Sequence, residues 1–68
     1  MKNGTKYCYL IIVQGHYGPR HGWEDVGAHE RWKDAREELR LYRENEPQYR
    51  HRAIRRRVLR QDYEAGRF

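Results

Sequence analysis

The chain has 68 residues and a mass of 8.4 kDa, so we expect a single domain over residues 1–68, with flexible ends at 1–5 and 61–68. Hydrophobic residues make up 37% of it and charged residues another 37%, which leaves little material for a core. The only cysteine, Cys8, has no partner for an intrachain disulfide. The longest apolar run, Tyr7 to Val13, is far shorter than the roughly 20 residues that cross a bilayer. We expect no signal peptide and a location in a reducing cytoplasm.

The net charge of +5 lies entirely near the carboxyl end. Residues 1–48 carry eight Lys or Arg and eight Asp or Glu, a balance of zero. Residues 49–68 carry seven Arg and two acids, a balance of +5. The guanidinium group binds phosphate or carboxylate through two hydrogen bonds and stacks on flat rings. An excess that is so local favours an anionic partner over a general role in solubility.

Three strands are predicted from residue type. Lys6 to Gln14 is rich in β-branched and aromatic residues and contains no breaker. Glycines and a proline then mark residues 15–22 as a loop, after which Trp23 to Val26 is expected to return as an antiparallel edge strand. Tyr49 to Leu59 is the third predicted strand, and residues 61–68 are expected to form a turn or a loose tail.

One amphipathic helix is predicted between the second and third strands, over about Glu30 to Asn45. Its apolar residues are spaced three, four and three positions apart and share one stripe, namely Trp32, Ala35, Leu39 and Tyr42. Pro47 ends the helix because proline lacks the amide donor and disfavours helical backbone in the residue before it.

The element order predicts an α+β fold, β-β-α-β, with a three-stranded antiparallel-type sheet in the order 2-1-3 and one helix packed on one face. A right-handed crossover from the second strand places the third strand beside the first. The first strand is apolar on both faces, with Cys8, Leu10 and Ile12 on one and Tyr9, Ile11 and Val13 on the other. Because one helix covers one face, we expect the other set to form an exposed apolar stripe.

Several blocks of the sequence resemble those of a known family. They are Gln14 to Tyr17, Gly22 to Val26, Ala35 to Glu37, Tyr42 to Pro47 and His51 to Val58. Together they resemble a family of small uncharacterised proteins from bacteriophages and prophage regions, over roughly residues 7–58. The resemblance implies a phage setting, with the protein in the cytoplasm of a bacterial host cell, where small phage proteins often bind host or defence machinery, anti-CRISPR proteins among them. Residues 19–21 depart from the family pattern by lengthening the first loop.

The candidate binding residues are Arg50, Arg52, Arg55, Arg57, Tyr49, Tyr9 and Trp23. Alternate residues of a strand share a face, so Arg55 and Arg57 are expected to point the same way as His51 and Ala53, while Ile54 and Val58 face the helix. The arginines would bind nucleic-acid phosphates beside tyrosine rings on which bases stack. Trp23 is either an interface anchor or a core residue.

Two other interpretations of the arginines compete with binding. They could pair with surplus acids of the helix, namely Glu37, Glu38 and Glu44, or could serve solubility alone. The alternative function is a self-associating structural or accessory phage protein that forms a homodimer through its open sheet face.

No catalytic residue, metal site or cofactor is predicted. His16, His21, His29 and His51 lack the paired spacing that zinc ligands usually show, and Cys8 is expected to be a buried, inert thiol. The glycine-rich loop lacks the Gly-Lys-Ser/Thr ending of a phosphate-binding loop. We therefore expect a non-enzymatic phage-type protein that binds nucleic acid or a host nucleic-acid-handling complex, with inhibition of host defence as one such role.

Overall fold

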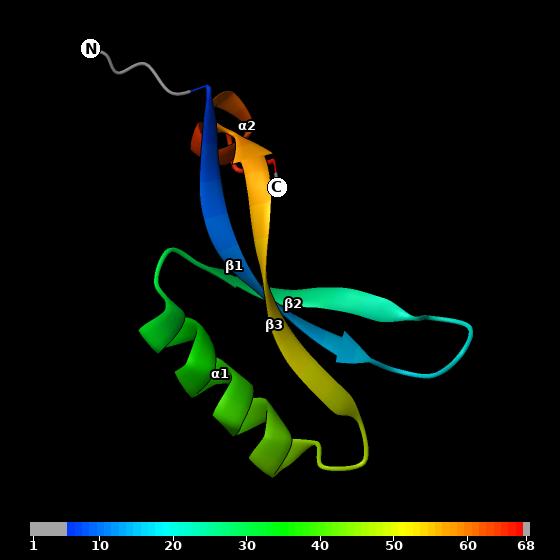
Figure 1. Ribbon diagram of the computed structural model, residues 1–68. Helices are drawn as coiled ribbons and strands as arrows, with labels where there is room; N and C mark the ends of the chain where they lie inside the picture. The colour runs from blue at the N-terminus through cyan, green and yellow to red at the C-terminus, as the bar shows by residue number, and fades with distance from the viewer. Residues whose placement is uncertain (1–5, 68) are drawn as a thin grey trace.

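The computed structural model describes residues 6–67 and confirms the predicted α+β architecture. Its elements in chain order are β1 (Tyr7–His16), β2 (Trp23–His29), α1 (Trp32–Asn45), β3 (Arg50–Leu59) and α2 (Arg60–Glu64). The sheet order is β2-β1-β3, and β1 is antiparallel to both neighbours, as predicted (Figure 1). The predictions for residues 1–5 and for Phe68 lie outside the described residues.

β2 is longer than predicted and contains an irregularity. It continues past Val26 to His29, because the small residues Gly27 and Ala28 fit beside the central strand. Val13 of β1 pairs with Gly27, whereas the next residue along β1 pairs with Asp25, so Val26 is an extra residue in β2. Such a bulge bends an edge strand and increases its local twist.

The core lies between α1 and one face of the sheet. Ile11, Val13 and Ala35 are buried there, and four partly buried residues pack against them, namely Val26, Leu39, Tyr42 and Ala53. Val13 is flanked by Gly27 on β2 and by Ala53 on β3, so small residues leave room for the helix to approach. The predicted stripe of α1 is thus confirmed for three of its residues, but Trp32 at the start of the helix is exposed.

The face of the sheet opposite α1 is not the exposed apolar stripe that we expected. Leu10 and Ile12 are only 2% and 1% exposed. Arg56 on β3 contacts Asp25 on β2, and because β1 lies between these two strands, the contact crosses over β1. The side chains of the sheet itself therefore cover much of this face.

A short helix, α2, occupies residues 61–64 of the segment 61–68 for which a turn or loose tail is predicted. The amide of Arg60 donates a hydrogen bond to the carbonyl oxygen of Lys6 (2.9 Å), which ties the end of β3 to the start of β1. Arg60 and Tyr63 line the same hollow as Cys8 and Leu10, so α2 helps to cover that end of β1. Cys8 is half-buried rather than fully buried.

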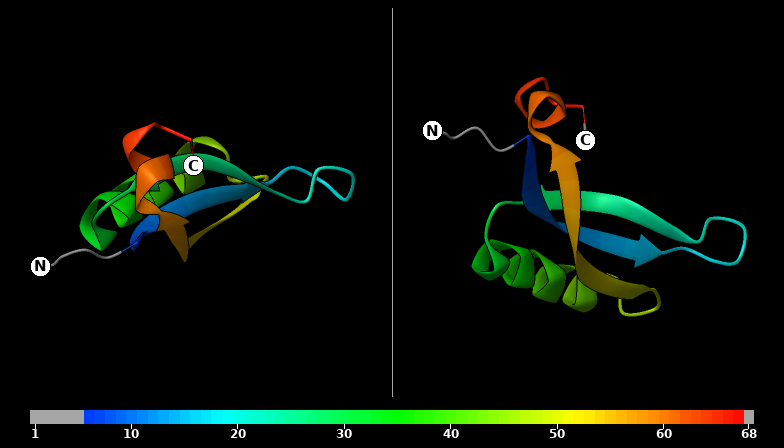
Figure 2. Two further views of the ribbon diagram at one scale, coloured as in Figure 1. Left: turned by 90° about the horizontal axis from the view of Figure 1, so that it is seen from above. Right: turned by 45° about the horizontal axis from the view of Figure 1, so that its top comes forward.

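Part of the sheet has only two strands. β2 pairs with β1 from Ile11 onward, whereas Tyr7 to Leu10 pair with β3 alone. This two-stranded extension, formed by residues 7–10 of β1 and 56–59 of β3, reaches away from α1 and ends at α2 (Figures 1 and 2). Side chains of the extension on that side of the sheet are therefore not covered by α1. Among residues 6–67, no helix has the length and apolar character that crossing a membrane requires.

Candidate nucleic-acid interface

Two tyrosine–arginine pairs form a ladder on the uncovered part of the α1 side of the sheet. The guanidinium carbon of Arg55 lies over the ring of Tyr9, 4.6 Å from its centroid, and that of Arg57 lies over Tyr7 at 4.4 Å. Each arginine is the diagonal cross-strand neighbour of its tyrosine, since Tyr9 pairs directly with Arg57. We call these four residues the Arg–Tyr ladder.

The Arg–Tyr ladder is open to solvent. Tyr9 is 52% exposed and Tyr7 is 37% exposed, and both arginines are exposed. Within the part of the chain that the structure describes, neither Arg55 nor Arg57 forms an ion pair with an acidic side chain. Stacking on a ring engages the face of a guanidinium and leaves its N–H edge able to bind an anion.

A second basic and aromatic cluster lies on the opposite face of the sheet. Arg52 is positioned 4.1 Å from the centroid of the Trp23 ring, and Arg50 lies 6.0 Å from the same centroid. The ring of His16 meets Trp23 edge-on at 5.1 Å. We call Trp23, Arg50 and Arg52 the Trp23 cluster. Trp23 is therefore not a residue of the core between α1 and the sheet but is half-buried beneath guanidinium groups.

A chain of hydrogen bonds fixes the arginine of this cluster. The Nε of Arg52 donates to the Oε1 of Gln14 at 2.8 Å, and the Nε2 of Gln14 donates to the Oδ1 of Asp25 at 2.8 Å. Gln14 is only 5% exposed, so this network satisfies a buried amide at the end of the apolar run of β1. Arg56 completes the network by donating to both carboxylate oxygens of Asp25, at 2.5 and 3.2 Å.

The network sets the charge state of its acid. The hydrogen bond from Arg56, joined by that from Gln14, holds the pKa of Asp25 below its ordinary value. The same contact raises the pKa of Arg56. Arg56 is thus the arginine of β3 that an internal acid engages, and this acid belongs to β2 rather than to the helix.

The structure separates the predicted binding residues. Arg55, Arg57 and Tyr9 belong to the ladder, whereas Arg50, Arg52 and Trp23 lie on the other face. Tyr49 joins neither group, because its ring packs against Tyr17 at 4.9 Å beside His51.

The prediction for β3 is right about which residues share a face and wrong about which face meets α1. Arg55, Arg57, His51 and Ala53 do share a face, but it is this face, not that of Ile54 and Val58, that meets α1. The reason lies in the register, because Ala53 pairs with Val13, on which the helix packs.

Sequence reasoning missed Tyr7 and the Gln14 network. Tyr7 shares the parity of Tyr9, so strand alternation alone could have found it. For the network, the signal was a glutamine at the end of an apolar run, since a polar residue at such a position is usually hydrogen-bonded. Its partners could not be identified, because Asp25 and Arg56 come from two other strands.

The helix acids do not neutralise the arginines of β3. Glu38 contacts His29 at 2.7 Å, and Glu44 pairs with Arg40 of its own helix at 2.8 Å. The predicted pairing of β3 with the acids of α1 is therefore wrong for these two residues.

His51 is structural, and its environment is aromatic. Its side chain has no exposed surface, its ring stacks on Tyr42 at 5.0 Å, and its Nε2 lies 3.2 Å from Glu46. Burial, together with the nearby Glu46, raises the pKa of Tyr17, whose hydroxyl donates to the same carboxylate. Among the described residues, the Nδ1 of His51 is a buried polar atom without a hydrogen-bond partner.

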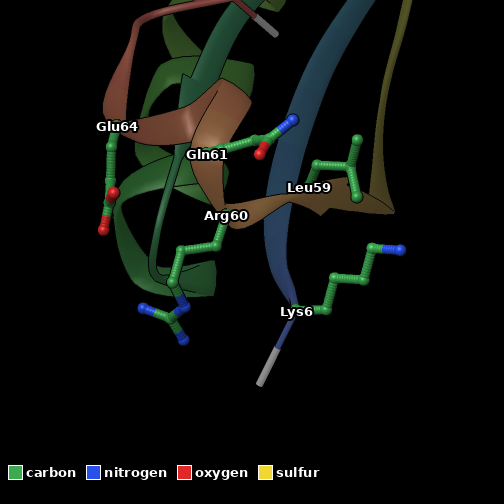
Figure 3. Close-up of a pocket in the computed structure, with 5 residues that line it drawn as sticks. All are labelled: Lys6, Leu59, Arg60, Gln61 and Glu64. Atoms are coloured by element: carbon green, nitrogen blue, oxygen red, sulfur yellow. The ribbon is translucent and has the colours of Figure 1, made fainter. Parts of the chain in front are cut away.

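A hollow at the junction of β3 and α2 is lined by Lys6, Leu59, Arg60, Gln61 and Glu64. Figure 3 shows the Lys6 and Arg60 side chains extending in different directions rather than toward a common point. Within residues 6–67, His, Cys, Asp and Glu side chains do not come together in groups of three that could hold a metal ion.

Comparison of the chain with protein-family models, with curated proteins and with solved structures gives no match.

Proposed function

We propose that the protein binds single-stranded nucleic acid without catalysing a reaction, and that the Arg–Tyr ladder is a primary contact. The observation that carries the proposal is the stacking of Arg55 and Arg57 on two exposed tyrosine rings, beyond the reach of α1. Such a surface combines a positive charge for phosphate with a flat ring for a base.

The spacing of the ladder suits an extended strand. Arg55 and Arg57 are alternate residues of β3, so their backbones are about 6.6 Å apart along the strand. Successive phosphates of an extended single strand are separated by a similar distance, so each guanidinium can meet one phosphate. The rings of Tyr7 and Tyr9 are partly exposed, and only unpaired bases can stack on them.

The charge of the ladder arginines and the burial of Leu10 and Ile12 favour nucleic-acid binding over self-association. The surplus of +5 lies in residues 49–68, and the ladder arginines are not neutralised by acids of residues 6–67. An apolar dimer interface on the open face would need Leu10 and Ile12, and both are covered. A phage setting and inhibition of host machinery remain predictions from the resemblance.

Fluorescence anisotropy with a labelled oligothymidine tests the proposal. The double variant R55A/R57A should bind about tenfold more weakly or worse, which corresponds to about 1.4 kcal/mol. The matched control R36A/R40A removes the same number of charges from exposed positions of α1 and should bind nearly as well as the wild type. Far-UV circular dichroism of each variant verifies that it is folded.

Three results would contradict the proposal. The wild type could fail to bind the oligonucleotide at low salt, or the α1 control could lose as much affinity as the ladder variant. A pull-down from nuclease-treated bacterial lysate could also recover a specific protein whose capture depends on Arg55 and Arg57. That last result would assign the ladder to a host protein complex instead.

A further inference from the structure

We infer that the protein carries two separate nucleic-acid sites, one on each face of its sheet, and that one molecule can therefore hold two strands at once. The second site is the Trp23 cluster. This inference rests on the proposed function and extends it from binding to bridging. What carries it is the division of the arginines of β3 between the two faces.

The two sites are separated in two directions. Arg50 and Arg52 have one strand parity and Arg55 and Arg57 the other, so their side chains leave opposite faces of β3. Along β1, the ladder is beside Tyr9, whereas the Trp23 cluster is beside His16, which pairs with both Trp23 and Arg50. Tyr9 and His16 are separated by seven residues of extended strand, about 23 Å, and the nearest arginines of the two sites, Arg52 and Arg55, by three residues, about 10 Å.

The Trp23 cluster is suited to binding phosphate. Arg52 uses its Nε for Gln14, which orients the guanidinium and leaves its two terminal nitrogens without a hydrogen bond to residues 6–67. The carboxylate of Asp25 is already occupied by Gln14 and Arg56, so it does not neutralise Arg52. A guanidinium held in place before binding loses less conformational freedom when an anion arrives.

Arg50 adds a second cation to the cluster. It is exposed, it lies 6.0 Å from the Trp23 ring centroid, and it forms no ion pair with an acid among residues 6–67. Both guanidinium groups lie over the indole ring of Trp23. The result is a pair of cations on an aromatic base, which is the same chemistry as the ladder on the other face.

Bridging follows from the placement of the sites. A strand bound along the ladder leaves the Trp23 cluster accessible, because the sheet itself stands between the two. One molecule can then join two strands, or two segments of one long strand, and the second contact becomes intramolecular in the latter case. Linked sites of this kind raise overall affinity on long ligands without any new contact.

A two-oligonucleotide capture experiment tests the inference. An oligonucleotide of about 4 nucleotides, which spans roughly 20 Å and cannot reach around the sheet from one face to the other, is fixed to beads, and a fluorescent second copy is added with the protein. The wild type should retain the fluorescent strand on the beads. Each half-site variant, R50A/R52A or R55A/R57A, should still bind one oligonucleotide in anisotropy through its remaining site, with R55A/R57A about tenfold weaker than the wild type, and should retain about tenfold less of the second strand.

Two controls make the result specific. R50E changes an exposed residue that forms no ion pair within the described chain, so it should lose capture without disturbing the fold even if R52A does. R36A/R40A should capture as well as the wild type. An equimolar mixture of R50A/R52A and R55A/R57A should not capture, because neither molecule then has two sites.

The outcomes separate this inference from the proposed function. Binding of one oligonucleotide per molecule, with no retention of a second, would overturn bridging and leave the proposed function intact. Retention by R50A/R52A and R50E, or by the mixture of half-site variants, would also overturn it, since the second contact would then come from elsewhere or from a dimer. Failure of the wild type to bind any oligonucleotide would overturn both proposals.

Discussion

Gly27 provides a sharp test of how α1 packs on the sheet. An ideal Cβ at this position would collide with the carboxylate of Glu38, which reaches from α1 across β2 to contact His29 at 2.7 Å. Gly27→Ala should therefore displace Glu38 and break its contact with His29. A background that lacks the Glu38 carboxylate also lacks the three atoms nearest to this Cβ, so the same substitution should no longer meet that collision.

The expected magnitudes have opposite signs in the two backgrounds. In the wild type, loss of a partly exposed, charge-assisted contact should lower the free energy of unfolding by about 1–2 kcal/mol. For a domain of this size, the melting temperature would fall by about 4–16 °C. In the Glu38→Ala background, Gly27→Ala should raise the free energy of unfolding by about 0.5–1 kcal/mol, because glycine within a strand is entropically unfavourable. The coupling energy between the two positions is then about 1.5–3 kcal/mol, within the range found for residues in direct contact.

Urea denaturation followed by circular dichroism on the four proteins of the cycle measures this coupling. Glu37→Ala, at an exposed neighbouring position of α1, is the matched control, and Gly27→Ala should remain destabilising beside it. A coupling energy below about 0.5 kcal/mol would refute the reasoning, because residues without shared partners are additive to that level.

Three further predictions concern charge and the core. The hydrogen bond from Arg56 lowers the pKa of Asp25. The ionised Asp25 therefore stabilises the folded state above its unfolded pKa of about 3.9, and this stabilisation is lost as the pH falls through the lower folded pKa. Below about pH 4, the free energy of unfolding of the wild type, measured in urea, should fall more steeply than that of Asp25→Asn. Ile12→Ala should lower the free energy of unfolding by about 2–5 kcal/mol. Because so small a core supplies roughly 3–5 kcal/mol, this variant should be largely unfolded by circular dichroism. Ile12→Val should lower the free energy of unfolding by about 0.5–1.5 kcal/mol and remain folded. In anisotropy titrations between about 50 and 200 mM salt, removal of Arg55 and Arg57 should make the plot of log affinity against log salt shallower by about 1.4, which is 0.7 for each of two phosphates.

The strand order could be predicted because local signals agreed with one another. β1 is apolar at both parities, as a central strand requires, and the loop, helix and crossover rules placed its neighbours. The face of β3 that meets α1 could not be predicted from hydropathy, which favoured Ile54 and Val58. Close approach of the helix instead requires a small residue, Ala53, beside Val13, and the neighbouring polar residue His51 is buried on Tyr42.

The residue types of the candidate site were predictable, but their arrangement was not. A cluster of arginines and nearby aromatic residues is visible in the sequence, and strand alternation grouped Arg55 with Arg57. The coverage of Ile12 depends on a contact between Asp25 and Arg56, which are brought together only when β1 lies between their strands. Interactions between residues so far apart in the sequence depend on the complete sheet and cannot be predicted from a local sequence pattern.

Asp25 and Arg56 should change together in evolution, because their side chains contact each other across β1. Loss of the acid would leave Arg56 and Gln14 without their partner, and loss of Arg56 would leave Asp25 without its ion pair, so either change alone should destabilise the sheet, by little because both side chains are partly exposed. Descendants of this chain should therefore either keep both residues or replace both together, for example with two aliphatic side chains. A lineage that replaces both residues with aliphatic ones exchanges a polar surface for an apolar surface, which can then become the interface of a new assembly.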